Sequence, residues 1–451
     1  MNRMTQKKSV LLVTGLMTAL LLLRGVQAHA IIDGETDLSA APTFSFVAKQ
    51  GTISLGDGSI MHMWGYGIDT PGGSMQYPGP TLIIQQGADV TIQLRNLLPE
   101  AVGNVAIIFP GHKATATGGV DGLFTKEAPT GGTVTYQFTA DNPGTYLYHA
   151  GTGLQVEMGL AGAIIVRSNT ASVADPPFPD LQFAYNHAGS GYHREYLYFL
   201  TEMDPRVHEY VAAGQYDRID LTTYFATAWF INGRNFPDVM AGPFVPWLPT
   251  QPYNCQPRTH PGEKVLIRII GAGRDLHPMH YHGADFSVIA QDGRLLTTTV
   301  GAPSTAPPDL QWKANTFRVT PGQTADAIWT WTGEGLGWDI YGHVPGDGTT
   351  CTPGPDGFDV ATYEWCADHQ VPFPVIIPPR DDLQFGQFWS GTPFLGGEAG
   401  GLPPGHPGLN EGSGYFYMWH SHTEKEISTI NLFPGGYITF MIVEHPDVPI
   451  P

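Results

Sequence analysis

The chain has 451 residues, of which 42% are hydrophobic and only 14% are charged, so it is long enough for two or three domain cores. A formal net charge of −19 disfavours nucleic acid as a partner, because such a surface repels phosphate. The 56 glycines and 39 prolines, with short β-branched runs between turn signals, favour an all-β fold over a helical one.

The N-terminal residues have the pattern of a secretory signal. Basic residues Arg3, Lys7 and Lys8 precede an apolar run from residue 10 to 23, and small residues near Ala28 offer a cleavage site. We therefore expect a signal peptide over residues 1–28 and a secreted or periplasmic protein. The alternative is an uncleaved anchor, although the run is short for a span of about 20 residues. After signal cleavage we expect no membrane contact.

Short strand patterns follow at 81–99, 131–140 and 144–167, and together they predict a sandwich-like first domain over residues 40–170. A Pro-rich connector, DPPFPD, lies at 175–180. Further strand patterns begin near Glu195 and end in YITFMIVEH, and they predict a second domain over residues 190–450.

The second domain contains a long irregular insertion at about 342–414, rich in Gly and Pro. Loops of this length are usually functional or disordered, so the insertion either borders a site or is a plain surface excursion. In an oxidising compartment its two cysteines, Cys351 and Cys366, can form a disulfide, which leaves Cys255 unpaired. We do not expect Cys255 to bind copper, because it is remote in sequence from the histidine-rich segments.

Two segments of the second domain are rich in histidine. DLHPMHYHGADF carries His277, His280 and His282, and YMWHSHTEKE carries His420 and His422. Residues two apart in a strand point to the same face, so each segment can present a pair of imidazoles. Imidazole pairs suit copper, zinc or iron.

At this point the chain resembles the multicopper oxidases, especially their two-domain, laccase-like branch, and its first domain is similar to that of copper nitrite reductases. The resemblance is carried by YPGPTLIIQQGADVTIQLRNLLP, NPGTYLYHAGTGLQVEMGLAGAIIV, FINGRNFPD, DLHPMHYHGADFSVIAQDG, VTPGQTADAIWTWTG and YFYMWHSHTEKE. It implies two cupredoxin-like Greek-key β-sandwich domains, copper as cofactor, and reaction with dioxygen or a small molecule.

In the family, eight histidines from four HxH-type motifs hold a trinuclear copper cluster. By this resemblance the second domain keeps four ligand positions and the first domain keeps one, while Ile108-Phe109-Pro110 stands at the upstream motif. The predicted copper ligands are therefore His149, His280, His282, His420 and His422.

The family's blue-copper set is further reduced, because only His277 matches it. Ser421 replaces the cysteine, Glu426 stands at the second histidine and Asn431 at the usual axial methionine. In nitrite reductases a cysteine thiolate follows the first-domain histidine, and here the residue that follows His149 is Ala150. We keep His277 as a further metal candidate, with a structural role as the alternative.

These ligands predict an extracytoplasmic copper oxidoreductase without a blue centre. The alternative is a non-catalytic cupredoxin that binds, stores or delivers copper, or in which the histidines are relics. A site shared between the first domain of one subunit and the second domain of another, as in two-domain laccases, would favour a homotrimer.

Three other features have plainer interpretations. His112 is expected to be an exposed loop residue, and His62, between Met61 and Met63, to pack in a core. Glu424 and Glu426 are either proton shuttles or hard-metal ligands, or they mark a solvated strand end.

Overall fold

The computed structural model describes residues 32–151, 153–298, 307–337, 350–367, 391–393, 415–444, 446 and 448–450. The predicted signal peptide and most of the insertion lie outside these residues. In the described part of the chain, no helix has both the length and the apolar character needed to cross a membrane.

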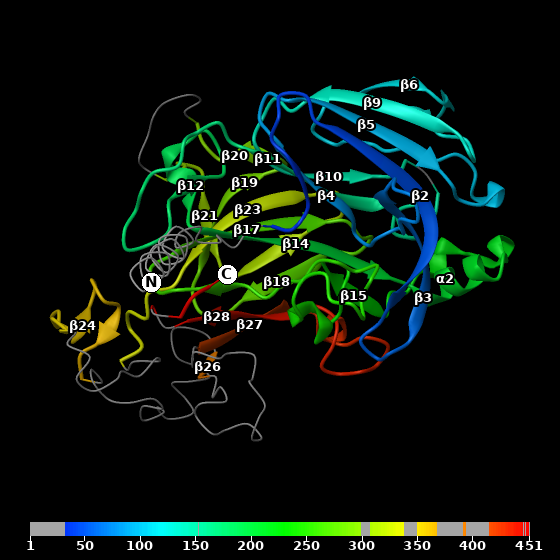
Figure 1. The fold of residues 1–451 in the computed structure, drawn as a ribbon. Helices are drawn as coiled ribbons and strands as arrows, with labels where there is room; N and C mark the ends of the chain where they lie inside the picture. The colour runs from blue at the N-terminus through cyan, green and yellow to red at the C-terminus, as the bar shows by residue number, and fades with distance from the viewer. Residues whose placement is uncertain are drawn as a thin grey trace, which may run out of the picture.

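The described chain is almost entirely β, as predicted, and nine of its first eleven strands form one β-sandwich, while β7 and β8 pair with each other (Figure 1). One sheet has the strand order β1-β4-β11-β10 and the other the order β3-β2-β5-β9-β6. The strands are β1 (Glu35–Asp37), β2 (Thr43–Ser54), β3 (Ile60–Ile68), β4 (Gly79–Gln85), β5 (Asp89–Asn96), β6 (Thr115–Gly118), β7 (Val120–Asp121), β8 (Lys126–Glu127), β9 (Thr133–Thr139), β10 (Gly144–His149) and β11 (Ala161–Arg167).

After the short strands β12 (Gln182–Phe183) and β13 (Gly191–Tyr192), two larger sheets form the second sandwich. One has the order β15-β14-β17-β23-β19-β20, with β21 beside β19, and the other the order β16-β28-β27-β18-β22, with β26 beside β27. The strands are β14 (Arg194–Met203), β15 (Ala228–Ile231), β16 (Arg258–Thr259), β17 (Lys264–Gly271), β18 (His277–Tyr281), β19 (Phe286–Gln291), β20 (Arg294–Leu295), β21 (Trp312–Ala314), β22 (Thr316–Val319), β23 (Thr324–Thr330), β24 (Phe358–Asp359), β25 (Glu364–Trp365), β26 (Gly391–Pro393), β27 (Tyr415–Ser421) and β28 (Ile438–Val443).

The burial of each strand follows from its place in this stack of sheets. In β5 and β9 buried residues alternate with more exposed ones, because only one face packs on a core. Strands β4, β11 and β14 are buried almost throughout, since both faces are covered. Ile83 and Ile165 of the first sandwich share an apolar cluster with Phe199 and Ile270 of the second, so the two are packed together (Figure 1). The predicted limits of 40–170 and 190–450 stay a prediction.

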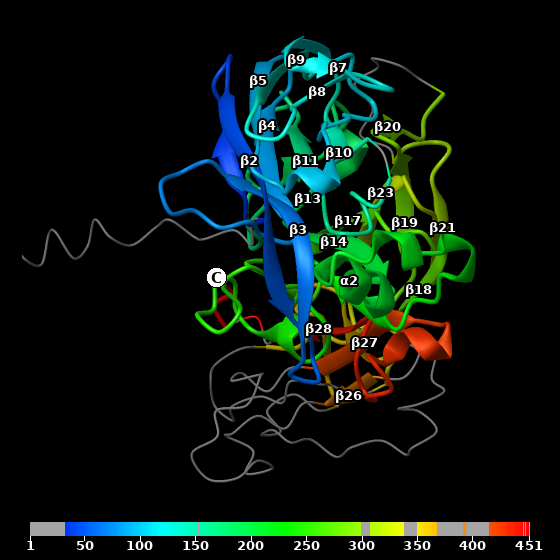
Figure 2. The ribbon, with the colours of Figure 1, turned by 90° about the vertical axis from the view of Figure 1, so that its right-hand side faces the viewer.

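In the described residues, helical structure is confined to short segments. The helix α2 (Pro205–Ala212) begins at Asp204, whose side chain accepts the backbone N–H of Arg206, and Pro205 fits the first helical position. Figure 2 shows α2 beside β3, and β27 and β28 at the end of the molecule far from β9. The short 3-10 helices are η1 (Glu100–Val102), η2 (Ala188–Ser190), η3 (Tyr216–Arg218), η4 (Leu221–Thr223), η5 (Asp238–Met240) and η7 (Glu424–Ile427).

The cysteines are arranged as the sequence predicts. Cys351 and Cys366 form a disulfide, and Cys255 is free and buried. Burial raises the pKa of the Cys255 thiol to about 12, so it is a neutral core residue rather than a thiolate ligand.

Candidate metal centre

The two histidine-rich segments lie on neighbouring antiparallel strands. In the register of β18 and β27, His280 lies directly opposite His420. The pairing extends past the end of β27, because the backbone N–H of His422 donates to the carbonyl of Pro278 at 2.9 Å. Since side chains two apart share a face, the register places His280, His282, His420 and His422 on one face of the strand pair. We call these four residues the imidazole face.

The four rings are close neighbours. The ring centroid of His280 lies 4.7 Å from the centroids of His282 and His422. The ring centroid of His420 lies 5.2 Å from the same two centroids. The Nε2 atoms of His282 and His420 lie 3.2 Å apart. The structure therefore brings together the four histidines that the sequence predicts in the second domain.

Hydrogen bonds at the rear nitrogens fix which ring nitrogen is free. His420 Nδ1 lies 2.8 Å from the carbonyl of Ser421, which can only accept, so Nδ1 carries the proton. His280 Nδ1 lies 2.8 Å from Thr316 Oγ1, whose own proton goes to Asn315 Oδ1. In both rings Nε2 is then the unprotonated nitrogen, as in histidines that bind metals, and in His420 it faces His282 Nε2 at 3.2 Å.

The electrostatic surroundings keep these rings neutral. Burial, and then the three neighbouring imidazoles, lower the pKa of His280 to about 3. Burial lowers the pKa of His420 to about 4, although its bond to the Ser421 carbonyl opposes the shift. A neutral imidazole with a free Nε2 is the form that coordinates copper, so this donor set fits the ion.

The imidazole face is not a closed cage. Three metal-ligating atoms that all lie within 4.8 Å of one another could hold an ion. Among the described residues, the one such group of His, Cys, Asp or Glu is Cys351, Asp359 and Cys366, and its two cysteines form the disulfide. No three rings of the imidazole face meet this criterion. The four histidines are thus arranged as pairs. His282 and His420 are buried, His280 is half-buried and His422 is exposed, so the face is open on one side.

His149 has the same local geometry on the other sandwich. It ends β10, and its backbone pairs with Ile108. Its Nδ1 lies 2.7 Å from the carbonyl of Ala150, which leaves Nε2 free, and burial lowers its pKa. Within the described part of the chain, none of its contacts is with the imidazole face.

His277 lies on the opposite face of β18 and faces two carboxylates. Its Nε2 is 2.8 Å from Glu202 Oε2, and its Nδ1 is 3.1 Å from Glu426 Oε2. Burial opposes a charge on the ring, but the two carboxylates outweigh it and raise the pKa of His277 to about 9. An imidazolium has no lone pair for a metal, so the geometry fits the structural alternative better than the ligand role.

Ser421 and Glu426, which stand at the positions of the family's cysteine and second histidine, bind each other. Ser421 Oγ donates to Glu426 Oε2 at 2.5 Å. Glu426 is 2% exposed, so the alternative of a solvated strand end is wrong for it, whereas Glu424 is exposed. The residues present do not fit a blue copper, because they offer an imidazolium, a hydroxyl and a carboxylate in place of a thiolate and neutral imidazoles.

His112 and His62 are both packed against other side chains. The expectation of an exposed His112 is wrong, because its ring packs on Phe138 and Tyr146 with centroid distances of 4.6 and 4.4 Å. Burial lowers the pKa of His112 to about 4, and its Nε2 has no partner. Met61 and Met63 lie in an apolar cluster beside half-buried His62, which confirms core packing for these methionines.

The sequence did not reveal the residues that hold these histidines. Glu202 is 75 residues from His277, and Thr316 is 36 residues from His280. A carboxylate near the end of a buried strand was the one available signal for Glu202. Thr316 becomes apparent only when β22 is paired with β18.

Two segments of the chain match family models described as multicopper oxidase, residues 69–171 and residues 220–335. The first segment contains His149 and the second contains His280 and His282. Among curated relatives, multicopper oxidase VdtB of Byssochlamys spectabilis is 39% identical over 95 residues, which are 20% of this chain and 13% of that protein. L-ascorbate oxidase of Cucurbita pepo var. melopepo is 36% identical over 105 residues, 23% of this chain and 17% of that protein.

A solved structure shares the fold. Blue copper oxidase from Nitrosomonas europaea aligns with a TM-score of 0.51 and 17% identity, covering 89% of this chain and 85% of that chain. The alignments with the two curated relatives cover less than a fifth of those proteins. A multicopper oxidase family model therefore matches one segment in each sandwich, and the chain shares the fold of that solved copper oxidase.

Proposed function

We propose that the protein is a copper oxidoreductase whose centre is built on the imidazole face, with His149 as a further ligand. The observation that carries the proposal is the shared tautomer of His149, His280 and His420. Each ring is held at Nδ1 and has Nε2 as its unprotonated nitrogen, which in His420 faces the Nε2 of His282 on the same imidazole face. No carboxylate competes for these nitrogens in the contacts described above.

Copper bound at this face supplies one-electron chemistry, by cycling between its two oxidation states, for the reaction of a small molecule or dioxygen. The protein's own residues orient the ligands through the Ser421 carbonyl and Thr316 Oγ1. The exposure of His422 leaves a path for a small reactant, because a catalytic site needs an open coordination position.

The missing ligands are best supplied by a second copy of the chain. A copper ion held by two histidines of the imidazole face would still have unfilled coordination positions. His149 has an unprotonated Nε2 but makes no contact with the imidazole face of its own chain. A closed ring of three subunits would bring His149 of one subunit to the imidazole face of the next. We therefore propose a homotrimer.

Without a blue centre, electrons have no relay from a bulky donor. The substrate is consequently a small molecule that reaches the copper directly. The basic and apolar N-terminal segment further supports export, with a signal cleaved near residue 28 and a secreted or periplasmic location.

Oxygen uptake tests the function. Metal-free protein, copper-loaded protein and free copper at the same concentration are compared with L-ascorbate and with small phenols as donors. Catalytic uptake by the copper-loaded protein alone supports the proposal. Stoichiometric copper binding without turnover for any donor would favour the storage alternative. Sedimentation of the copper-loaded protein tests the trimer, and a copper-saturated monomer would contradict it.

A further inference from the structure

The face of β18 and β27 that is turned away from the imidazole face carries a buried chain of charged side chains. His277 lies between Glu202 and Glu426, and the side chains of these three residues are at most 2% exposed. The ring of Tyr437 packs edge-on against His277 with a centroid distance of 4.7 Å. Buried charges persist only when they are paired, so these partners are held in one arrangement.

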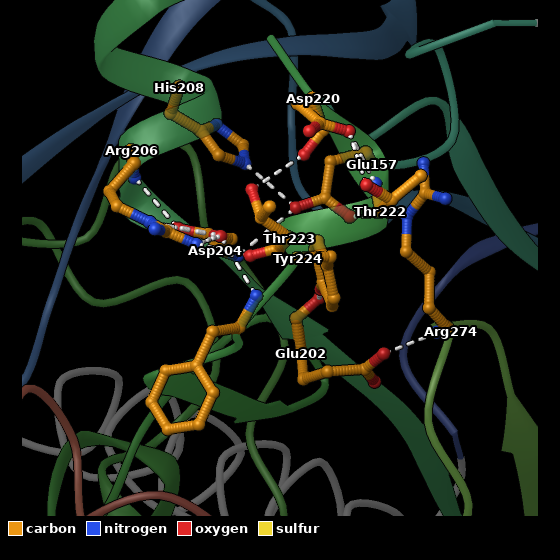
Figure 3. Close-up of polar contacts among 11 residues, drawn as sticks. Glu157, Glu202, Asp204, Arg206, His208, Asp220, Thr222, Thr223, Tyr224 and Arg274 are labelled. Atoms are coloured by element: carbon orange, nitrogen blue, oxygen red, sulfur yellow. Dashed lines mark hydrogen bonds and ion pairs between the residues drawn. The ribbon is translucent and has the colours of Figure 1, made fainter.

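This series of charged side chains continues towards the first sandwich. Glu202 Oε1 accepts the backbone N–H groups of Arg274 and Asp275. The Arg274 side chain then donates from Nε to Glu157 Oε2 at 2.9 Å, and Figure 3 shows Arg274 reaching from Glu202 to Glu157. Glu157 is 1% exposed, and it also accepts the backbone N–H of Asp204 at 3.1 Å.

Glu157 belongs to the segment that follows His149. Glu157 lies eight positions after His149, and the strand β11 begins just after Glu157, at Ala161. The carboxylate therefore ties the loop behind one predicted ligand to the second sandwich.

At its other end this series of side chains reaches Ser421, which lies between the predicted ligands His420 and His422. Glu426 accepts the Ser421 hydroxyl through its side chain, and its carbonyl accepts the N–H of Tyr437 at 2.8 Å. Ser421 Oγ in turn accepts the N–H of Thr423 at 3.1 Å, and the Ser421 carbonyl is the group that holds His420 Nδ1. Glu426 thus fixes the turn on which the His420–His422 segment is oriented.

We propose that Glu157, Arg274, Glu202, His277 and Glu426 form a positioning network that holds the His420–His422 segment in place relative to the loop behind His149. Glu426 is the positioning residue that binds Ser421, between His420 and His422. The effect of this network on bound copper rests on the proposed function, but its effect on the position of the His420–His422 segment does not.

The test compares Glu426→Gln with Glu424→Gln, because both residues lie in η7 but only Glu426 is buried. Hydrogen exchange is measured in the metal-free, full-length protein. Removal of the Glu426 charge breaks one of the two ion pairs of buried His277 and weakens the acceptor of the Ser421 hydroxyl. We expect exchange in β27 to be at least about tenfold faster in Glu426→Gln, a loss of about 1.4 kcal/mol in local opening, with β5 unchanged. Glu424→Gln should match the wild type in both strands.

The copper readout is separate. If the wild type binds copper, Glu426→Gln should change its electron paramagnetic resonance spectrum, and Glu426→Asp, which restores the charge, should recover part of it. Unchanged exchange in β27, or faster exchange with an unchanged copper spectrum, would overturn the proposal. If Glu426→Gln does not fold, Glu426→Asp is compared with Glu424→Asp by the same exchange measurement. If the wild type binds no copper, the proposed function fails, while the exchange result still decides the positioning role.

Discussion

The two faces of the β18–β27 strand pair use the same residue type in opposite ways. On the imidazole face, burial and neighbouring rings keep His280 and His420 neutral, with Nε2 as the unprotonated nitrogen. On the reverse face, two carboxylates keep His277 charged. The comparison teaches that the partner of an imidazole, rather than its burial, decides whether it can serve as a metal ligand.

The largest expected effect is spectroscopic, and it concerns the reverse face. With Ser421, Glu426 and a charged His277 in place of a blue-copper set, copper-loaded protein should show no intense thiolate-to-copper absorption band and should be nearly colourless. The absorption spectrum after copper loading checks this. An intense blue band that disappears in Cys255→Ser would mean that the buried Cys255 binds copper after all.

The next effect is on stability and separates the faces. Glu202→Gln breaks the buried ion pair between Glu202 and His277 and leaves Glu426 as the remaining carboxylate beside the ring, so we expect the free energy of unfolding to fall by about 3 kcal/mol. His422→Ala, on the exposed edge of the imidazole face, should change it by no more than about 0.5 kcal/mol. Urea unfolding of both metal-free variants is the measurement. Equal losses would show that the two faces do not differ as described.

The two faces should also respond to pH in opposite directions. The pKa of His277 is raised to about 9, so its stabilising effect is complete below pH 6.5 and is lost as the pH rises through 9. The pKa of His280 is lowered to about 3, so the unfolded chain binds more protons and stability falls as the pH drops from 6.5 towards 3. Unfolding of metal-free protein across this range should show both limbs. His277→Gln should remove the alkaline limb, and His280→Ala should weaken the acidic one.

The smallest effect concerns a histidine outside both faces. His112→Leu removes a buried nitrogen that has no partner and keeps the contacts with Phe138 and Tyr146. We expect stability to be unchanged or to rise by less than about 1 kcal/mol, with copper binding unaffected. A loss of copper in this variant would extend the site beyond the imidazole face.

Local pattern carried much of the fold and of the site. The period of two in strands places His280 with His282 and His420 with His422, and the spacing of the cysteines allows the Cys351–Cys366 disulfide. The partners of His277 could not be predicted in this way, because Glu202 on β14 and Glu426 in η7 meet it only after these elements have packed against β18. The burial of His112 depends in the same way on Phe138 and Tyr146, which lie on other strands.

The most direct test of the central claim is the copper content of two variants after loading and dialysis, with folding checked by circular dichroism. His282→Ala combined with His422→Ala removes one ring from each segment of the imidazole face, and His277→Gln changes only the reverse face. The account predicts that the double variant loses tightly bound copper while His277→Gln keeps the wild-type stoichiometry. Copper retained in the folded double variant, or lost in folded His277→Gln, would contradict it.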